Sequence, residues 1–192
     1  MKEICKKNQF LLINYLKKRD IMFYMNALLV IAGNNFRDEE LFVTKSELEK
    51  NGIKTVIASG ELKESKGMLG KTAKPELLLS NADAKDYDAV IFVGGAGASE
   101  YFGDAHALSL AKSAYSSGKV VAAICIAPVI LANAGILKGR RATVFESMAK
   151  KITDKGAKYV DEDFVVDGKI VTADGPASSR AFSREIIKAL KK

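Results

Sequence analysis

Short apolar runs alternate with amphipathic segments along most of this chain. The apolar runs are rich in β-branched residues, have the usual length of buried strands, and occupy residues 27–32, 54–58, 88–93, 119–124 and 142–145. Apolar positions recur at helical spacing in the segments between or after them, at residues 38–50, 105–117, 147–155 and 177–190, and again just after Cys125. Strands that alternate with helices predict an α/β fold with a three-layer, doubly wound and mostly parallel sheet.

Turn residues refine this pattern. Asn51-Gly52 ends the first helix, and Asp167-Gly168 between two β-branched runs predicts a hairpin over residues 163–173. Residues 67–79 fit either an edge hairpin or a long loop. Ligands of doubly wound sheets bind at the carboxyl ends of the strands, so any site is expected at that edge.

Cys125 lies where one apolar run stops and a helical pattern begins within three residues. A strand that turns sharply into a helix holds the residue at the turn in a strained backbone, with its side chain beside free N–H groups. The positive end of the helix dipole would then favour the thiolate. An unpaired cysteine in an apolar run is also a common small core residue, and the residues alone support both interpretations about equally.

Two other segments converge on the same edge of the sheet. Gly94-Gly95 follows a strand directly, so its amides and the amide after Cys125 are candidates for an oxyanion hole. A tight turn that needs positive φ explains the same two glycines. The acidic group Asp38-Glu39-Glu40 is favourable charge in a first helical turn, or it supplies a carboxyl that exchanges a proton with the thiol.

Composition narrows the class of protein. The chain has 192 residues and 48% hydrophobic residues, which fits a compact domain with a sizeable core. Its apolar runs are far shorter than the roughly 18 residues of a membrane helix. Cys5 and Cys125 show no metal or disulfide spacing, which predicts a reducing cytoplasm. Dinucleotide and P-loop motifs are missing from the sequence, so we expect no cofactor and no metal.

The charge is concentrated at the start of the chain. Of the formal net charge of +7, residues 1–25 carry +4, and charges alternate in sign over the remainder. A solvated surface explains this better than a nucleic-acid site, and we expect neither nucleic acid nor membrane as a partner. Residues 1–25 fit a basic N-terminal extension, as a peripheral amphipathic helix, or a translated leader before Met22 or Met25. Residues 26–192 form the predicted domain.

Several motifs in order resemble the ThiJ/PfpI superfamily over about residues 26–190: ALLVIA…DEEL, DAVIFVGG, AAICIAP, LKGRRATVF and DEDFVVDGKIVTADGP. The resemblance implies a flavodoxin-like sandwich, similar to class I glutamine amidotransferases, that forms homodimers or larger homo-oligomers. It also implies that Cys125 is the reactive cysteine and Glu40 its acidic partner. Gly95 and Ile126 match the backbone donors of the oxyanion position.

The chain departs from this family at its histidines. Ile126 stands where the protease-like branch has a histidine after the cysteine, and Glu146 aligns roughly with a later histidine of the deglycase-like branch. His106 is the one histidine of the chain and opens a helix that should be peripheral. A cysteine–histidine pair within one subunit is therefore not expected, which disfavours a peptidase or an amidotransferase.

Three hypotheses follow. In the first, Cys125 attacks a small reactive carbonyl such as methylglyoxal, or its adduct on a protein, while Glu40 shuttles the proton in glyoxalase or deglycase chemistry. In the second, Cys125 is a non-enzymatic redox or stress-response thiol that oxidises to the sulfinic acid. In the third, the protein is a PfpI-like intracellular cysteine protease, an interpretation that Ile126 weakens.

Overall fold

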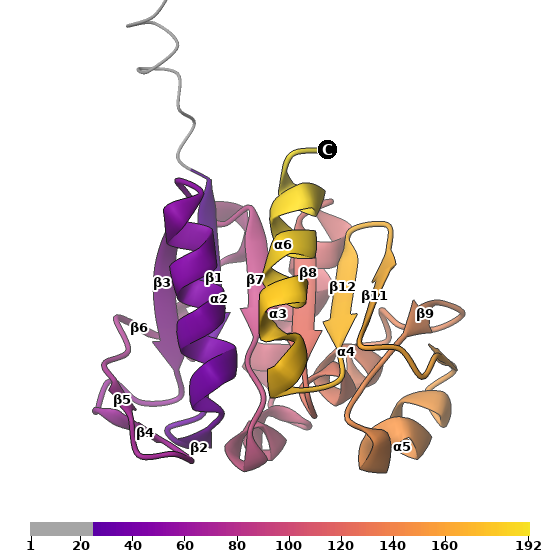
Figure 1. Ribbon diagram of the computed structural model, residues 1–192, viewed down its shortest axis with the longest axis horizontal. Helices are drawn as coiled ribbons and strands as arrows, with labels where there is room; N and C mark the ends of the chain where they lie inside the picture. The colour runs from indigo at the N-terminus through magenta and orange to yellow at the C-terminus, as the bar shows by residue number, and fades with distance from the viewer. Residues whose placement is uncertain (1–24) are drawn as a thin grey trace, which may run out of the picture.

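A computed structural model describes residues 25–192, and a seven-stranded sheet forms its centre (Figure 1). The strand order is β11-β12-β8-β7-β1-β3-β6, and every neighbouring pair is parallel except β11 and β12. In chain order these strands are β1 (Asn26–Val30), β3 (Lys54–Ser59), β6 (Leu77–Leu78), β7 (Ala89–Phe92), β8 (Val120–Ile124), β11 (Phe164–Asp167) and β12 (Ile170–Ala173). The predicted α/β class is confirmed, and so is the hairpin at Asp167-Gly168.

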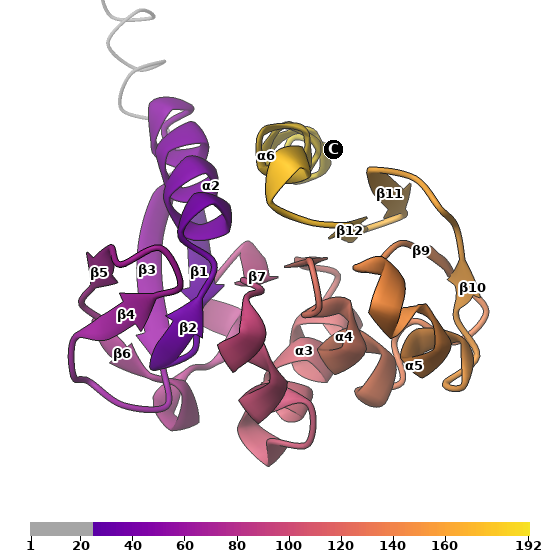
Figure 2. The ribbon, with the colours of Figure 1, turned by 60° about the horizontal axis from the view of Figure 1, so that its bottom comes forward.

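Helices cover both faces of the sheet. One layer contains α2 (Asp38–Lys50) and α6 (Ser179–Leu190), and the other contains α3 (Ala105–Ser116), α4 (Pro128–Asn133) and α5 (Ala149–Thr153). Figure 2, in which the carboxyl ends of the parallel strands come forward, shows the two layers on opposite sides of the sheet. Within residues 25–192, no helix is long and apolar enough to cross a membrane.

The two layers explain why the apolar runs are continuous. Successive side chains of a strand point to opposite faces, so Leu28 packs into the core under α3 and α4 while Leu29 packs into the core under α2 and α6. Both leucines are fully buried. When helices cover both faces of a sheet, every side chain of a strand is buried, so its apolar run is continuous. In a sheet with one face in water, apolar and polar residues alternate.

The structure differs from the predicted elements in several short segments. The strand expected at residues 142–145 is only β9 (Arg141–Ala142), because the Thr143 N–H donates to the Thr172 hydroxyl (3.0 Å) instead of continuing a ladder. β9 pairs with β10 (Lys158–Tyr159) in a separate small sheet. The 3₁₀ segments are η1 (Leu79–Asn81), η2 (Ala84–Asp86), η3 (Ala96–Tyr101), η4 (Glu146–Met148) and η5 (Pro176–Ser178).

Residues 65–73 form a hairpin beside the main sheet. It consists of β4 (Ser65–Gly67) and β5 (Thr72–Ala73), and β4 also pairs with β2 (Asn34–Phe36), a strand that the sequence did not predict. The edge-hairpin alternative for this region is therefore correct for its first part, while β6 extends the main sheet.

Asp38 anchors this hairpin from within the fold. Its carboxylate is almost completely buried and accepts hydrogen bonds from the N–H groups of Leu69 (2.8 Å) and Lys71 (2.9 Å). Burial opposes ionisation, but these backbone donors outweigh it and lower the pKa of Asp38. A side chain at Gly67 would collide with the same carboxylate, so the close approach requires glycine.

We predict that Asp38→Asn destabilises the fold by about 2 kcal/mol at pH 7, because the amide keeps the size but turns an N–H donor toward a backbone donor. Urea unfolding measures the change. Asp83→Asn is the matched control: Asp83 accepts from the Lys85 N–H (3.0 Å) at an exposed cap, where asparagine serves as well. Equal stability of Asp38→Asn and wild type would contradict this role of Asp38.

Candidate functional site

Cys125 follows β8 directly and has a φ of 62°, which is rare for a residue with a side chain. Its N–H donates to the Ala173 carbonyl (2.9 Å), and its own carbonyl accepts from the Phe145 N–H (2.8 Å). The strained turn that the sequence predicts is therefore present, held by neighbouring segments on both sides. The turn holds the thiol half-buried at the carboxyl end of the sheet.

Glu40 is the acidic residue that faces the thiol. It lies in the first turn of α2, is fully buried, and accepts a hydrogen bond from the Gly94 N–H at Oε2 (2.8 Å). The Cys125 thiol lies close enough to affect the pKa of this carboxyl, and Oε1 has no hydrogen-bond partner among residues 25–192. The two other acids of this turn have different partners: Asp38 binds the hairpin, and Glu39 pairs with Arg37 (2.9 Å).

Gly94 makes the contact between acid and thiol possible. A Cβ on this residue would lie 2.6 Å from Cβ of Cys125 and 2.6 Å from Oε2 of Glu40, closer than atoms can pack. Gly95 has a φ of 94°, and its N–H and the N–H of Ile126 both interact with the Cys125 sulfur. Two backbone donors therefore point to the place where negative charge would develop on sulfur or on an oxygen beside it.

Electrostatics at the pair differ from the sequence-based expectation. Burial raises the pKa of Glu40 to about 8, so its carboxyl is mostly protonated at neutral pH. Burial, and after it the charge of ionised Glu40, raise the pKa of Cys125 to about 12, against the lowering effect of the Gly95 and Ile126 amides. The expected favoured thiolate is therefore wrong for the resting protein, because the six-residue α4 does not outweigh desolvation.

At neutral pH the raised pKa values of both groups keep two protons on the pair, and loss of the first proton gives a one-proton state. In the one-proton state, the proton resides on either the carboxyl or the thiol. The chemically useful form is the one in which Glu40 has taken the proton and Cys125 is a thiolate. Proton transfer within the pair, not a low thiol pKa, is what this geometry provides.

Cys125 lines a cleft of about 650 Å³. Most of its wall is apolar and comes from Met68, Phe102, Ile126, Phe145, Met148 and Pro176. Among residues 25–192, the charged residues that line it are two cations, Arg37 and Lys151. Such a wall holds few groups that would compete with Glu40 for the thiol proton.

Sequence reasoning missed several of these wall residues. Met68 comes from the hairpin, Phe145 follows β9, and Lys151 lies on α5, so no motif or strand end marks them. His106 is exposed on α3 and lines a separate cleft, away from Cys125. Glu146 is exposed and does not line the cleft of Cys125. No group of three potential ligands in residues 25–192 is arranged to hold a metal ion.

Fold and site together define a flavodoxin-like α/β protein in which a buried glutamate faces a half-buried cysteine at the carboxyl edge of the sheet. The profile of the DJ-1/PfpI family matches residues 25–189, and the chain belongs to this family.

Three known proteins illustrate the relationship. Deglycase PH1704 of Pyrococcus horikoshii is 34% identical over 85% of this chain and 99% of its own length. Glutathione-independent glyoxalase DJR-1.2 of Caenorhabditis elegans is 27% identical over 86% of this chain and 89% of its own. The crystal structure of a ThiJ/PfpI domain protein from Brachyspira murdochii matches with a TM-score of 0.85 at 38% identity, over 86% of this chain and 96% of that one.

The buried Glu40 carboxyl should lower the free energy of unfolding at pH values where it is ionised. Because folding raises the pKa of Glu40 from 4.5 to about 8, the cost is absent below about pH 4.5 and complete above about pH 8. We predict that Glu40→Gln unfolds at higher urea than wild type at pH 8, with a stability gap roughly 4 kcal/mol larger than at pH 4.5.

Glu39→Gln is the matched control for this measurement. The Glu39 side chain is 39% exposed in its pair with Arg37, and its replacement should change the free energy of unfolding by no more than about 0.5 kcal/mol at either pH. A gap for Glu40→Gln that stays constant from pH 4.5 to pH 8 would show that burial does not disfavour the ionised carboxyl.

Proposed function

We propose that this protein acts on small 2-oxoaldehydes such as methylglyoxal, or on their adducts with proteins, with Cys125 as nucleophile and Glu40 as proton shuttle. The observation that carries the proposal is the buried Glu40 carboxyl in contact with a thiol whose sulfur also meets the N–H groups of Gly95 and Ile126. The names of two relatives, a deglycase and a glutathione-independent glyoxalase, support the same chemistry.

The first step is addition to the aldehyde. From the one-proton state, Sγ of Cys125 forms a bond to the aldehyde carbon, and the carbonyl π electrons move to oxygen. The Glu40 carboxyl gives its proton to that oxygen, which yields a neutral hemithioacetal and leaves Glu40 ionised. The amides of Gly95 and Ile126 stabilise the negative charge while it develops on oxygen.

The second step uses the carboxylate that the first step produced. Glu40 takes the proton from the carbon bonded to sulfur and returns a proton to the neighbouring carbon. The hydroxyl proton on the first carbon passes to the oxygen of the second, so that the hemithioacetal becomes the thioester of a 2-hydroxy acid. Water then cleaves the thioester and regenerates the thiol. Methylglyoxal and water thus give lactate without an external oxidant or reductant. An adduct on a protein amine enters at the same carbon, with the amine as leaving group.

The two other hypotheses have less support. A cysteine peptidase needs a base such as imidazole, and His106 lies on α3 and lines a different cleft. Oxidation to the sulfinic acid depends on thiolate character, which the raised pKa of Cys125 reduces. We further propose, on the family resemblance and cysteine usage, that the protein works as a homo-oligomer in the cytoplasm.

We predict lactate formation from methylglyoxal in the absence of glutathione. Cys125→Ala should form lactate no faster than buffer, and Glu40→Gln should lose about 100-fold or more in kcat/KM, because amide nitrogen cannot exchange the proton. His106→Ala is the control, since this exposed residue is far from the chemistry proposed here. Wild-type turnover no faster than that of Cys125→Ala would rule the function out.

A further inference from the structure

We infer that the cleft selects 2-oxoaldehydes that carry an anionic group on an apolar, preferably aromatic, body, and that Lys151 determines this specificity. The inference rests on the proposed function for the reaction itself. The choice of substrate is inferred from the volume, lining and charge of the cleft.

The size of the cleft exceeds what methylglyoxal needs. Its volume of about 650 Å³ falls within the range of about 300–1,000 Å³ that is usual for clefts enclosing drug-sized ligands. A substrate that reacts at Cys125 therefore has room for a ring or chain beyond its dicarbonyl group.

The exposed part of the wall is suited to such an apolar body. Phe145 and Met68 are 46% and 45% exposed although both are large and apolar, and both line the cleft. Phe102 and Met148 add a second aromatic ring and a second thioether. Aromatic rings pack favourably against both kinds of group, so a ring on the substrate would cover surface that is otherwise left to water.

The charge of the cleft is positive at neutral pH. Arg37 is already neutralised, because its guanidinium donates to both carboxylate oxygens of Glu39 (2.9 and 3.2 Å). Lys151 forms no ion pair with any residue in 25–192. Glu40 is mostly protonated and adds little negative charge. Lys151 is therefore the one uncompensated cation among the described residues that line this mostly apolar wall.

Contact with Phe102 holds the Lys151 ammonium group over an aromatic ring of the cleft wall. The Lys151 Nζ lies 5.4 Å from the centre of the Phe102 ring, and both residues line the cleft. A cation–π contact of this kind holds an ammonium group over an aromatic face while its N–H donors stay available. A carboxylate or phosphate at the far end of a ring-bearing substrate would accept hydrogen bonds from it.

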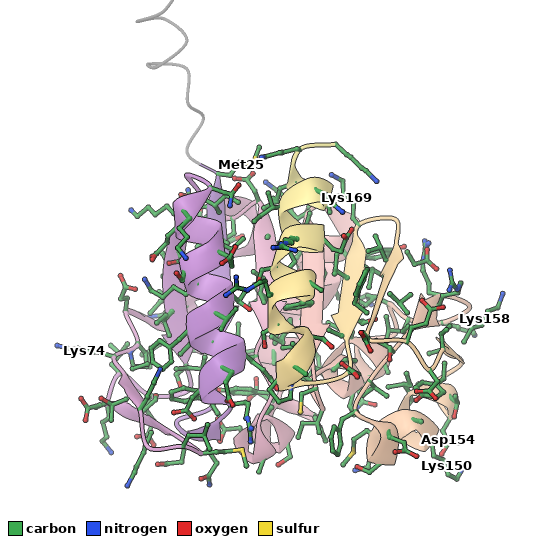
Figure 3. All side chains as sticks on the ribbon, in the orientation of Figure 1. Met25, Lys74, Lys150, Asp154, Lys158 and Lys169 are labelled. Carbon is green, nitrogen blue, oxygen red and sulfur yellow. The ribbon has the colours of Figure 1, made fainter. Side chains whose placement is uncertain are left out.

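Two arylglyoxals test this selection. In the wild type, kcat/KM should be about tenfold higher for 4-carboxyphenylglyoxal than for phenylglyoxal, and in Lys151→Met the ratio should fall to about one. Lys150→Met is the matched control. Lys150 lies on α5, pairs with Asp154 (2.8 and 3.0 Å; both are labelled in Figure 3), and does not line the cleft. Its ratio should equal that of the wild type.

A binding measurement separates this inference from the proposed function. Protection of Cys125 from iodoacetamide by 4-acetylbenzoate and by acetophenone requires no turnover. In the wild type, the concentration that gives half-protection should be about tenfold lower for 4-acetylbenzoate than for acetophenone. In Lys151→Met the two concentrations should be equal. If no 2-oxoaldehyde is turned over but this preference appears and depends on Lys151, the proposed function fails and the anion selectivity stands. Equal protection by both compounds in the wild type would overturn the inference.

Discussion

The contact between the Glu40 carboxyl and the Cys125 thiol is the constraint on which the rest of the site depends. It requires the start of α2, the turn after β7 and the end of β8 to meet at one point, and Gly94 allows this because it has no side chain. The Gly94 N–H also binds the carboxyl that it lets approach. A parallel sheet brings these segments together because its strands all end at the same edge.

This contact has opposite effects on stability and chemistry. Burial of the carboxyl disfavours its ionised form, which is a cost to the fold at neutral and alkaline pH. The same burial raises the pKa of Glu40, which lets this carboxyl take the proton of Cys125 and pass it to the substrate. Two large apolar cores under the helical layers supply the stability that tolerates such a group.

Much of the fold could be predicted from the sequence, and less of the site. Continuous apolar runs indicated a doubly covered sheet, and the abrupt change of period at Cys125 indicated a strained turn. Glu40 was singled out only by family resemblance, because nothing in the order Asp38-Glu39-Glu40 tells which side chain turns inward. Met68 and Lys151 line the cleft because of how the hairpin and α5 pack against the rest of the domain, and local sequence patterns do not predict such packing. The thiolate expectation failed because the degree of burial is a tertiary property.

The most direct test of the account is the rate of Cys125 alkylation by iodoacetamide as a function of pH, in the wild type and in Glu40→Gln. If the pair shares its protons as described, the wild-type rate rises with a step near pH 8, where the first proton leaves. In Glu40→Gln that step should disappear, and the rate should rise only at higher pH, because burial still raises the pKa of the thiol. An identical step near the ordinary thiol value of about 8.5 in both proteins would show that Glu40 and Cys125 are not coupled.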